Sequence, residues 1–242
     1  MSTTFPLYAQ IGGRRCLVVG GGPVAERKVQ DLLDAKAEVL LVSPEATPKL
    51  HTLAVEGRIV WLAERYASHH MEAVWLVFAA TNVRAVNAAV CADATKRRLF
   101  VNVADAPDDG TFLVPTVVRR GKLCLSVSTG GANPILARQI AQELAIAYGE
   151  DYADLVELLG EMRAYTKERP TERPTESTEE SPKESTKEST KESSNRREAL
   201  TRLVAHEAEL RRLLRASDRE GARTLALQII DAEITAEDTD LS

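Results

Sequence analysis

The stretch CLVVGGGPVAERKV, residues 16–29, decides how this chain begins to fold. An apolar run typical of a buried strand, residues 14–20, leads into three consecutive glycines. A helix-like run, residues 24–37, follows them and carries its apolar positions on one face. A strand that enters a helix through glycines has two interpretations: a nucleotide-binding loop, or a tight turn that needs glycine for its own geometry.

The glycines fit the pattern Gly-x-Gly-x-x-Ala at Gly20, Gly22 and Ala25. Gly20 allows the turn off the strand, Gly22 lets the backbone approach a pyrophosphate, and Ala25 lets the helix pack closely on the sheet. Phosphates would lie at the free N–H groups where the helix begins. We therefore predict these cofactor-binding residues: Gly20, Gly21, Gly22, Pro23, Val24 and Ala25.

The rest of the N-terminal half alternates strand-like and helix-like runs, which predicts an α/β, Rossmann-like parallel sheet with helices on both faces. The expected strands are residues 14–20, 38–44, 58–62, 73–81 and 99–104, and the expected helices are 24–37, 47–55 and 84–96. Two apolar runs around RRGK predict a hairpin within residues 111–129. Residues 135–165 are strongly helical, with a break expected near Gly149.

The composition changes sharply after residue 166. Residues 167–196 form a low-complexity charged linker that has too little apolar surface to bury a core; a binding tail is the alternative. Residues 197–233 predict amphipathic helices that pack back on the 135–165 helices. We predict three domains: 1–110, a Rossmann domain; 111–148, a hairpin plus helix of α+β type; and 149–242, a helical region interrupted by the linker.

The net charge and the residue composition limit the possible partners. The 242 residues carry a formal net charge of −5, which argues against nucleic acid, and residues 74–80 are too short an apolar run to span a membrane. The chain start lacks a secretory pattern, and Cys16, Cys91 and Cys124 form no CxxC pair, so we expect a cytoplasmic protein. His51, His69, His70 and His206 form no spaced metal motif, and we expect no metal site.

Three more strand ends predict cofactor contacts. The 2′-hydroxyl-binding acid that often follows the second strand is absent, and Ser43 replaces it beside Pro44. No arginine follows to accept a 2′-phosphate, so we predict NAD rather than NADP. Thr81 and Asn82 in AATN, and Asn102 in NVAD, complete the predicted cofactor-binding set. For Thr81, a helix-capping role is an equal and compatible alternative.

Several motifs occur in an order that resembles one family: FPLYAQIGGRRCLVVGGGPVAERKV, VSP, FAATN and NVADAPDDGTFLVPTVVRRGKLCLSVSTGGANPILAR. The chain is similar, over about residues 5–165, to the precorrin-2 dehydrogenase and sirohydrochlorin ferrochelatase family, the front module of siroheme synthase. The resemblance implies a small dimerisation domain, a homodimer, and NAD-dependent oxidation of precorrin-2 to sirohydrochlorin. Some members also insert ferrous iron to give siroheme. Full siroheme synthase adds a large methyltransferase module that these 242 residues do not contain, so we expect a separate protein to methylate uroporphyrinogen.

The resemblance also implies site residues. The aspartate at the NVADAP position is implicated in catalysis, so we predict Asp105 as the general base; the alternative is that it caps the turn at Ala106. The family often has serine where this chain has Thr129. A tetrapyrrole carries several carboxylates, and loop N–H groups and arginines are suited to bind them. The predicted substrate-binding residues are Ser128, Thr129, Gly130, Gly131, Asn133, Arg138 and Arg119, with Arg120 and Lys122 as further candidates.

Two other functions remain as alternatives. The first is an NAD-binding sensing or assembly module that has lost its chemistry; the presence of both NVADAP and TGGANP disfavours it. The second is a dehydrogenase for a different small substrate on the same fold. The absence of a histidine or lysine beside a conventional catalytic motif disfavours that one.

Overall fold

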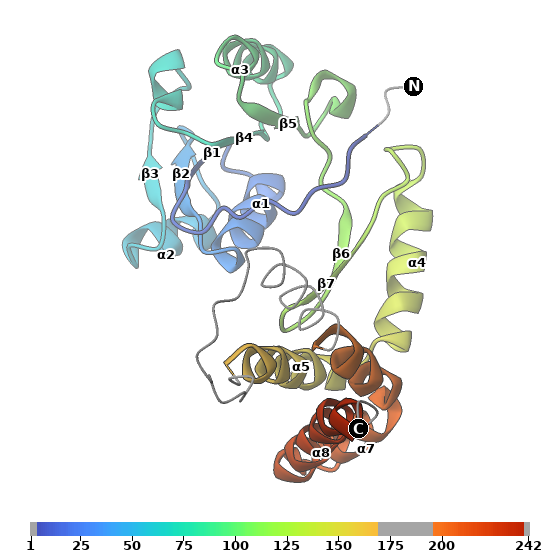
Figure 1. Cartoon of the computed structure of the whole chain (residues 1–242). Coiled ribbons are helices and arrows are strands. Elements are labelled where there is room, and N and C mark those ends of the chain that lie inside the picture. The colour runs from blue at the N-terminus through green and yellow to red at the C-terminus, as the bar shows by residue number, and fades with distance from the viewer. Residues whose placement is uncertain (1–3, 169–195, 240–242) are drawn as a thin grey trace, which may run out of the picture. The chain divides into compact units, whose positions relative to one another are not determined.

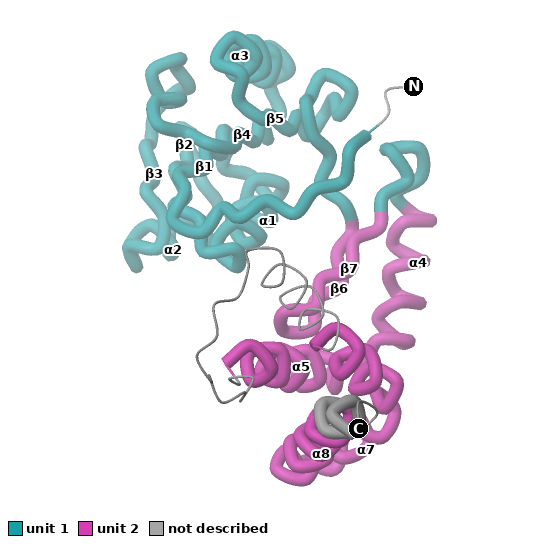
Figure 2. Tube along the Cα trace, viewed as in Figure 1, with its two compact units in different colours: residues 1–115, 128–134 teal, residues 116–127, 135–242 magenta. Residues whose placement is uncertain are grey.

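The computed structural model describes residues 4–168 and 196–239. They divide into two compact units: residues 1–115 with 128–134, and residues 116–127 with 135–242 (Figure 2). Most of the predicted 167–196 linker lies outside the described residues. The three-domain division remains a prediction, and each unit is described here by itself.

The first unit confirms the Rossmann-like α/β fold. Five strands, all pairing in parallel, form one sheet in the order β3-β2-β1-β4-β5 (Figure 1). The chain places β2 and β3 on one side of β1 and then returns to add β4 and β5 on the other. The elements are β1 Arg15–Val19, α1 Pro23–Asp34, β2 Glu38–Val42, α2 Pro48–Val55, β3 Val60–Leu62, η1 Ser68–Met71, β4 Leu76–Ala79, α3 Arg84–Lys96, β5 Phe100–Val103 and η2 Pro107–Asp109.

Helices cover both faces of the sheet because both faces of its strands are apolar. On one face Val18 and Leu41 pack against α1 and α2, in a cluster that includes Val29 and Leu50. On the other face the core includes side chains of α3 and η1. When both faces of a parallel sheet are buried, every position of its strands needs an apolar residue. The strand sequences therefore do not alternate between apolar and polar residues. Cys16 is fully buried in the first cluster, and burial raises the pKa of its thiol to about 11.

One helix ends earlier than the sequence predicts. We expected a helix over 24–37, but α1 ends at Asp34. Lys36 takes a left-handed conformation with φ 59°, and the N–H groups of Lys36 and Ala37 donate to the carbonyl oxygens of Leu33 and Leu32. This pattern closes a helix and turns the chain directly into β2.

The second unit contains the predicted hairpin, β6 Thr116–Arg120 and β7 Leu123–Val127, with antiparallel pairing. The expected helix over 135–165 is two helices, α4 Pro134–Ala147 and α5 Asp151–Glu168, so the break near Gly149 is confirmed. Residues 196–205 are helical, followed by α7 Glu207–Arg215 and α8 Arg219–Thr239.

A separate core holds the C-terminal helices. Leu158 and Met162 of α5 are buried with Leu203, Leu210 and Ile230. The prediction that the last helices pack back on the preceding ones is therefore confirmed for α5. Among the described residues, α4 contributes no side chain to this core, and its buried positions are only Ala137 and Ala141. No helix among the described residues is long and apolar enough to cross a membrane.

Candidate functional site

The glycine loop lies at the carboxyl end of β1, between β2 and β4. Gly20 has φ 117°, and a Cβ at this position would overlap the carbonyl oxygen of Ala80. A Cβ on Gly21 would overlap the carbonyl oxygen of Glu45, while the Gly21 carbonyl accepts from the Thr47 N–H at 2.9 Å. The first two glycines are therefore required by close backbone contacts within the fold.

Gly22 differs from them because a Cβ there would meet nothing within 4 Å. It is the N-cap of α1 and has no side chain to cap the helix, and Pro23 and Val24 begin the first turn with exposed side chains. The first N–H groups of a helix have no partner inside it, and the helix dipole favours an anion there. Ala25 is fully buried against the sheet, as predicted. Open space beside these N–H groups fits a pyrophosphate.

The loop after β2 is anchored through its backbone. Ser43 is buried; its N–H donates to the Leu62 carbonyl at 3.2 Å, and its carbonyl accepts from the Trp61 indole at 3.0 Å. Pro44 follows and is exposed. The loop then returns to Gly21 through Thr47, so the ends of β1 and β2 are joined by backbone contacts.

Thr81 follows β4 and holds the turn into α3. Its hydroxyl accepts from the Val83 N–H at 3.1 Å, and Val83 is the N-cap of the helix. Thr81 is therefore not the N-cap itself. It lies two residues before the N-cap, and its hydroxyl stabilises the turn that leads into the helix. Asn82 is exposed beside it.

Asp105 follows β5, and its side chain is 37% exposed. Its Oδ1 accepts from the amide of Asn87 at 2.7 Å, and its Oδ2 lies 3.5 Å from the Arg84 guanidinium. Arg84 also binds Asp109, and that hydrogen bond is the main cause of the raised pKa of Arg84. Among the described residues, Asp105 is held by side chains of α3 and does not cap the turn at Ala106.

Sequence reasoning missed Asn87, which joins two of the predicted residues. It is fully buried, and its amide binds both Thr81 and Asp105. The spacing of residues along α3 could have identified it. Asn87, Val90 and Ala94 share the face of α3 that packs on the sheet, and a buried polar side chain there needs a hydrogen-bond partner.

Asn102 lies outside this network and has a different partner. It is buried on β5, opposite Phe78, and its amide donates to the Phe112 carbonyl at 3.1 Å. The side chain therefore holds the segment that follows η2. Its predicted cofactor contact stays a prediction, since the amide oxygen and the second N–H are not used by this hydrogen bond.

Two hydroxyl groups of the predicted substrate loop accept hydrogen bonds from the loop's own backbone. The Ser128 Oγ accepts from the Gly130 N–H at 3.2 Å, and the Thr129 Oγ1 accepts from the Asn133 N–H at 3.0 Å. Gly130 and Gly131 have φ of 63° and 85°, and a Cβ on either would meet nothing within 4 Å. Thr129 thus supplies the hydroxyl that shapes the loop before α4.

The predicted basic residues differ in what they contact. Arg119 and Arg138 are exposed. Arg120 is half-buried, and its guanidinium donates to the carbonyl oxygens of Tyr148 and Ala145 at 3.0 and 3.1 Å. Arg120 therefore satisfies the carboxyl end of α4 and has fewer donors left for a substrate carboxylate.

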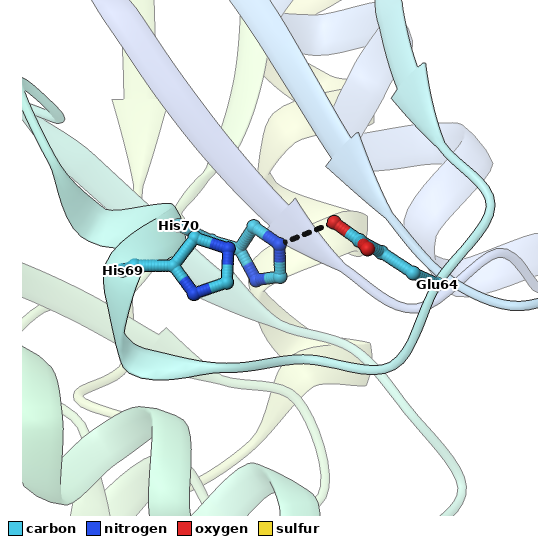
Figure 3. A group of neighbouring side chains, drawn as sticks. All are labelled: Glu64, His69 and His70. Atoms are coloured by element: carbon cyan, nitrogen blue, oxygen red, sulfur yellow. Dashed lines mark hydrogen bonds and ion pairs between the residues drawn. The ribbon is translucent and has the colours of Figure 1, made fainter.

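Glu64, His69 and His70 form a group with ligand-type atoms within 4.8 Å of one another (Figure 3). The buried His70 uses both ring nitrogens: Nδ1 accepts from the Ala67 N–H at 3.0 Å, and Nε2 lies 2.8 Å from the Glu64 carboxylate. Accepting at Nδ1 places the proton on Nε2, which donates to Glu64. A metal on Nε2 would require the opposite tautomer, so this arrangement favours a packing role for His70.

Residues 7–116 match a family model described as putative NAD(P)-binding. Siroheme synthase 3 of Aeromonas hydrophila is 38% identical over 164 residues, which are 68% of this chain and 35% of that protein. The siroheme synthase of Methylobacillus flagellatus is 41% identical over 166 residues, 69% of this chain and 36% of the relative. The chain spans about a third of the length of these curated relatives.

A solved structure of "SirC, precorrin-2 dehydrogenase" has the same fold. The TM-score is 0.68 at 24% identity, and the alignment covers 94% of this chain and 99% of that one. The likeness therefore extends through both compact units and the helices after residue 196.

Proposed function

We propose, from its relationship to the siroheme synthases, that this NAD(P)-binding chain oxidises precorrin-2 to sirohydrochlorin with NAD as the hydride acceptor. One observation carries the proposal. A continuous series of contacts runs from Gly20 to Ala80 and Thr81, through Asn87, to Asp105. The predicted phosphate loop and the predicted base thus meet at the carboxyl edge of the sheet, where its strand order reverses and such sheets bind ligands.

The residues at this edge fit a dinucleotide. The space beside Gly22 and the N–H groups of the first turn of α1 would hold the pyrophosphate. Ser43, at the end of β2, would bind a ribose hydroxyl. When bound, NAD supplies an acceptor for hydride.

Asp105 has the role of general base. Oxidation of precorrin-2 removes two electrons and two protons: a hydride leaves to the nicotinamide, and one proton leaves to the Asp105 carboxylate, which later releases it to water. Half-exposure suits this role, because the carboxylate has access to substrate and solvent while α3 fixes its position.

Substrate carboxylates would be bound by the loop at residues 128–133 and by Arg119 and Arg138. A Cβ on Gly130 or Gly131 would meet nothing within 4 Å, so a ligand can approach the loop backbone there. The N–H groups of Gly130, Ala132 and Asn133 donate within the loop, and we propose the Gly131 N–H as the backbone donor to a carboxylate. The exposed arginines would add charge-assisted hydrogen bonds.

A homodimer is part of the proposal. β6 and β7 form a two-stranded sheet, which leaves an outer edge on each strand. Apolar side chains of α4 are also exposed, with Ile135 at 74% and Ile146 at 85%. A second copy of this chain would cover both. No disulfide joins Cys16, Cys91 or Cys124, which supports a cytoplasmic location.

The test is an anaerobic assay of purified protein with NAD and enzymatically made precorrin-2, followed by sirohydrochlorin absorbance. We expect NAD-dependent oxidation, and a kcat lower by about 10²–10⁴-fold in Asp105→Asn, the range associated with loss of a general base. Asp108→Asn is the matched control, since Asp108 is an exposed acid three residues further on. A wild-type chain that binds NAD and leaves precorrin-2 unoxidised would support the sensing module instead.

Insertion of ferrous iron is the second activity we propose, because the same carboxylate can accept protons from pyrrole N–H groups. The assay is repeated with sirohydrochlorin and ferrous iron, against a protein-free control. Faster siroheme formation that needs Asp105 supports chelation. A rate equal to the control leaves a dehydrogenase alone.

A further inference from the structure

Asn87 is a fully buried amide in the first turn of α3, at the carboxyl edge of the sheet. A buried amide costs free energy unless each of its donors and acceptors is paired, so its contacts define what it does. It lies between Thr81, which follows β4, and Asp105, which follows β5. These are two of the residues that the proposed function uses.

All the hydrogen-bonding capacity of the Asn87 amide is used. Its Nδ2 donates to the Thr81 carbonyl at 2.9 Å and to Asp105 Oδ1 at 2.7 Å. Its Oδ1 accepts from the Thr81 N–H at 3.1 Å and from the Thr81 hydroxyl at 2.8 Å. Two donors and two acceptors are the complete set for this side chain. The reversed amide would set oxygen against oxygen at two of these four contacts, so the network fixes its orientation.

We infer that Asn87 is the positioning residue that fixes the Asp105 carboxylate relative to Thr81, and that Asp105 Oδ2 is the oxygen that accepts the proton. The inference rests on the proposed function. Oδ1 is bound to a buried donor, whereas Oδ2 has only a long contact, 3.5 Å, to the exposed Arg84 guanidinium. Oδ2 has the weaker contact within the protein, so it is the oxygen that a substrate can reach.

Charged groups around Asp105 support this assignment of its two oxygens. Arg84 comes from α3 and is bound more closely by Asp109 of η2 than by Asp105. The Arg84 guanidinium thus has its shorter contact with Asp109 and its longer one with Asp105 Oδ2. The amide of Asn87 holds Oδ1 as a neutral donor.

The test compares Asn87→Asp with Ala89→Asp. Asn87→Asp keeps an oxygen that can accept from the Thr81 N–H and hydroxyl, but it replaces the donor to Asp105 and to the Thr81 carbonyl with a second carboxylate oxygen. Ala89→Asp adds the same charge at an exposed position of α3. Two carboxylates in contact raise one pKa. We expect Asn87→Asp to lower kcat by at least about tenfold and to move the acid limb of its pH profile upward, with NAD affinity within about threefold of wild type. Ala89→Asp should match wild type.

An unchanged kcat and pH profile in Asn87→Asp overturns the inference. If that variant does not fold, the wild-type chain decides by NMR. The side-chain amide resonances of Asn87 should then titrate together with Asp105, and this titration should vanish in Asp105→Asn. Asn87 amide resonances whose chemical shifts do not follow the titration of Asp105 also overturn the inference. This readout needs no turnover, so it stays decisive even if precorrin-2 is not the substrate.

Discussion

Gly21 and Gly22 are neighbours that lack a side chain for different reasons. A Cβ on Gly21 would overlap the Glu45 carbonyl oxygen, in a loop held by the hydrogen bond from Thr47 to Gly21. A Cβ on Gly22 would meet no protein atom within 4 Å, and the backbone there is extended, with φ −87°. Glycine at position 21 is therefore required by contacts within the fold, whereas we propose that glycine at position 22 leaves space for a ligand.

This difference gives a paired prediction. Gly22→Ala should fold normally, with a free energy of unfolding lower by less than about 1 kcal/mol, because only the N-cap preference changes. Its NAD affinity should fall about tenfold or more, equivalent to at least about 1.4 kcal/mol, since the methyl group occupies the approach to the helix N-terminus. Gly21→Ala should instead lose about 1–3 kcal/mol of stability from overpacking.

Urea unfolding and NAD titration measure the two effects separately. A Gly22→Ala protein that binds NAD as wild type does would remove the pyrophosphate assignment from this glycine. A Gly21→Ala protein of unchanged stability would show that the loop at Glu45 can shift to make room.

Local pattern was enough to predict the turn at Gly20 and the close packing of Ala25, because a strand, a turn and a helix follow one another in the sequence. The role of Gly22 stays a prediction. The contact of Gly21 with Glu45 could not be predicted in the same way, since it depends on how the loop after β2 returns. Asn87 was missed for a related reason. Its partners lie six and eighteen residues away, and only the folded sheet edge brings them together.

The pairing of α5 with α7 depends on a charged network as well as an apolar core. Arg211 of α7 binds Asp151 and Glu207, and its guanidinium lies 4.0 Å from the centre of the Tyr152 ring. Burial opposes ionisation of Asp151, but hydrogen bonds from Arg211 and Arg215 outweigh it, so the pKa of Asp151 lies below its usual 3.8. A hydrogen bond from Tyr152 is the main cause of the lowered pKa of Glu207.

Both carboxyl groups therefore stabilise the helical unit when ionised. Because their pKa values are lower in the folded chain, this contribution is complete above about pH 4.5 and is lost as the pH falls below 4. Arg211→Gln should lower the free energy of unfolding at pH 7 by about 2 kcal/mol, the scale of hydrogen bonds to charged groups, and should flatten the acid dependence.

Urea unfolding of the C-terminal helices at pH 7, 5 and 3 measures this effect. Arg212→Gln is the matched control, because Arg212 is 76% exposed and has only a 3.8 Å contact with Glu209. If the Arg211 variant kept the acid dependence of wild type, the network would not be its source. The sequence predicted these amphipathic helices from their periodicity, but it could not predict which arginine lies against Asp151.

The chain passes between its two compact units three times. Residues 116–127 leave the first unit, residues 128–134 return to it, and residue 135 begins the second again. The sequence predicted the hairpin and the loop that make these passages, and the three-domain division at 110 and 148 stays a prediction. Neither unit corresponds to one continuous piece of sequence.

The proposed homodimer gives a prediction for the intact protein. Wild type should elute with twice the mass of its 26.5 kDa chain, and Ile146→Asp should shift it toward the monomer. The reason is that Ile146 of α4 is 85% exposed, and a charge buried without a partner in an interface is strongly unfavourable. Light scattering after gel filtration measures the mass.

Val55→Asp is the control, since Val55 ends α2 and is 76% exposed on the first unit. It should leave the mass unchanged. A wild-type chain that stays monomeric at micromolar concentration would contradict the dimer, and equal shifts in both variants would point to general loss of solubility.

The position of β4 beside β1 has a consequence for the protein during its synthesis. Cys16 of β1 pairs with Leu76 of β4, so β1 leaves the ribosome well before the strand that it pairs with, and such distant pairings form slowly. Until then Gly20 faces no Ala80 backbone, and the glycine loop lacks one of its walls. The nascent chain can therefore complete the glycine loop only after translation has passed residue 81.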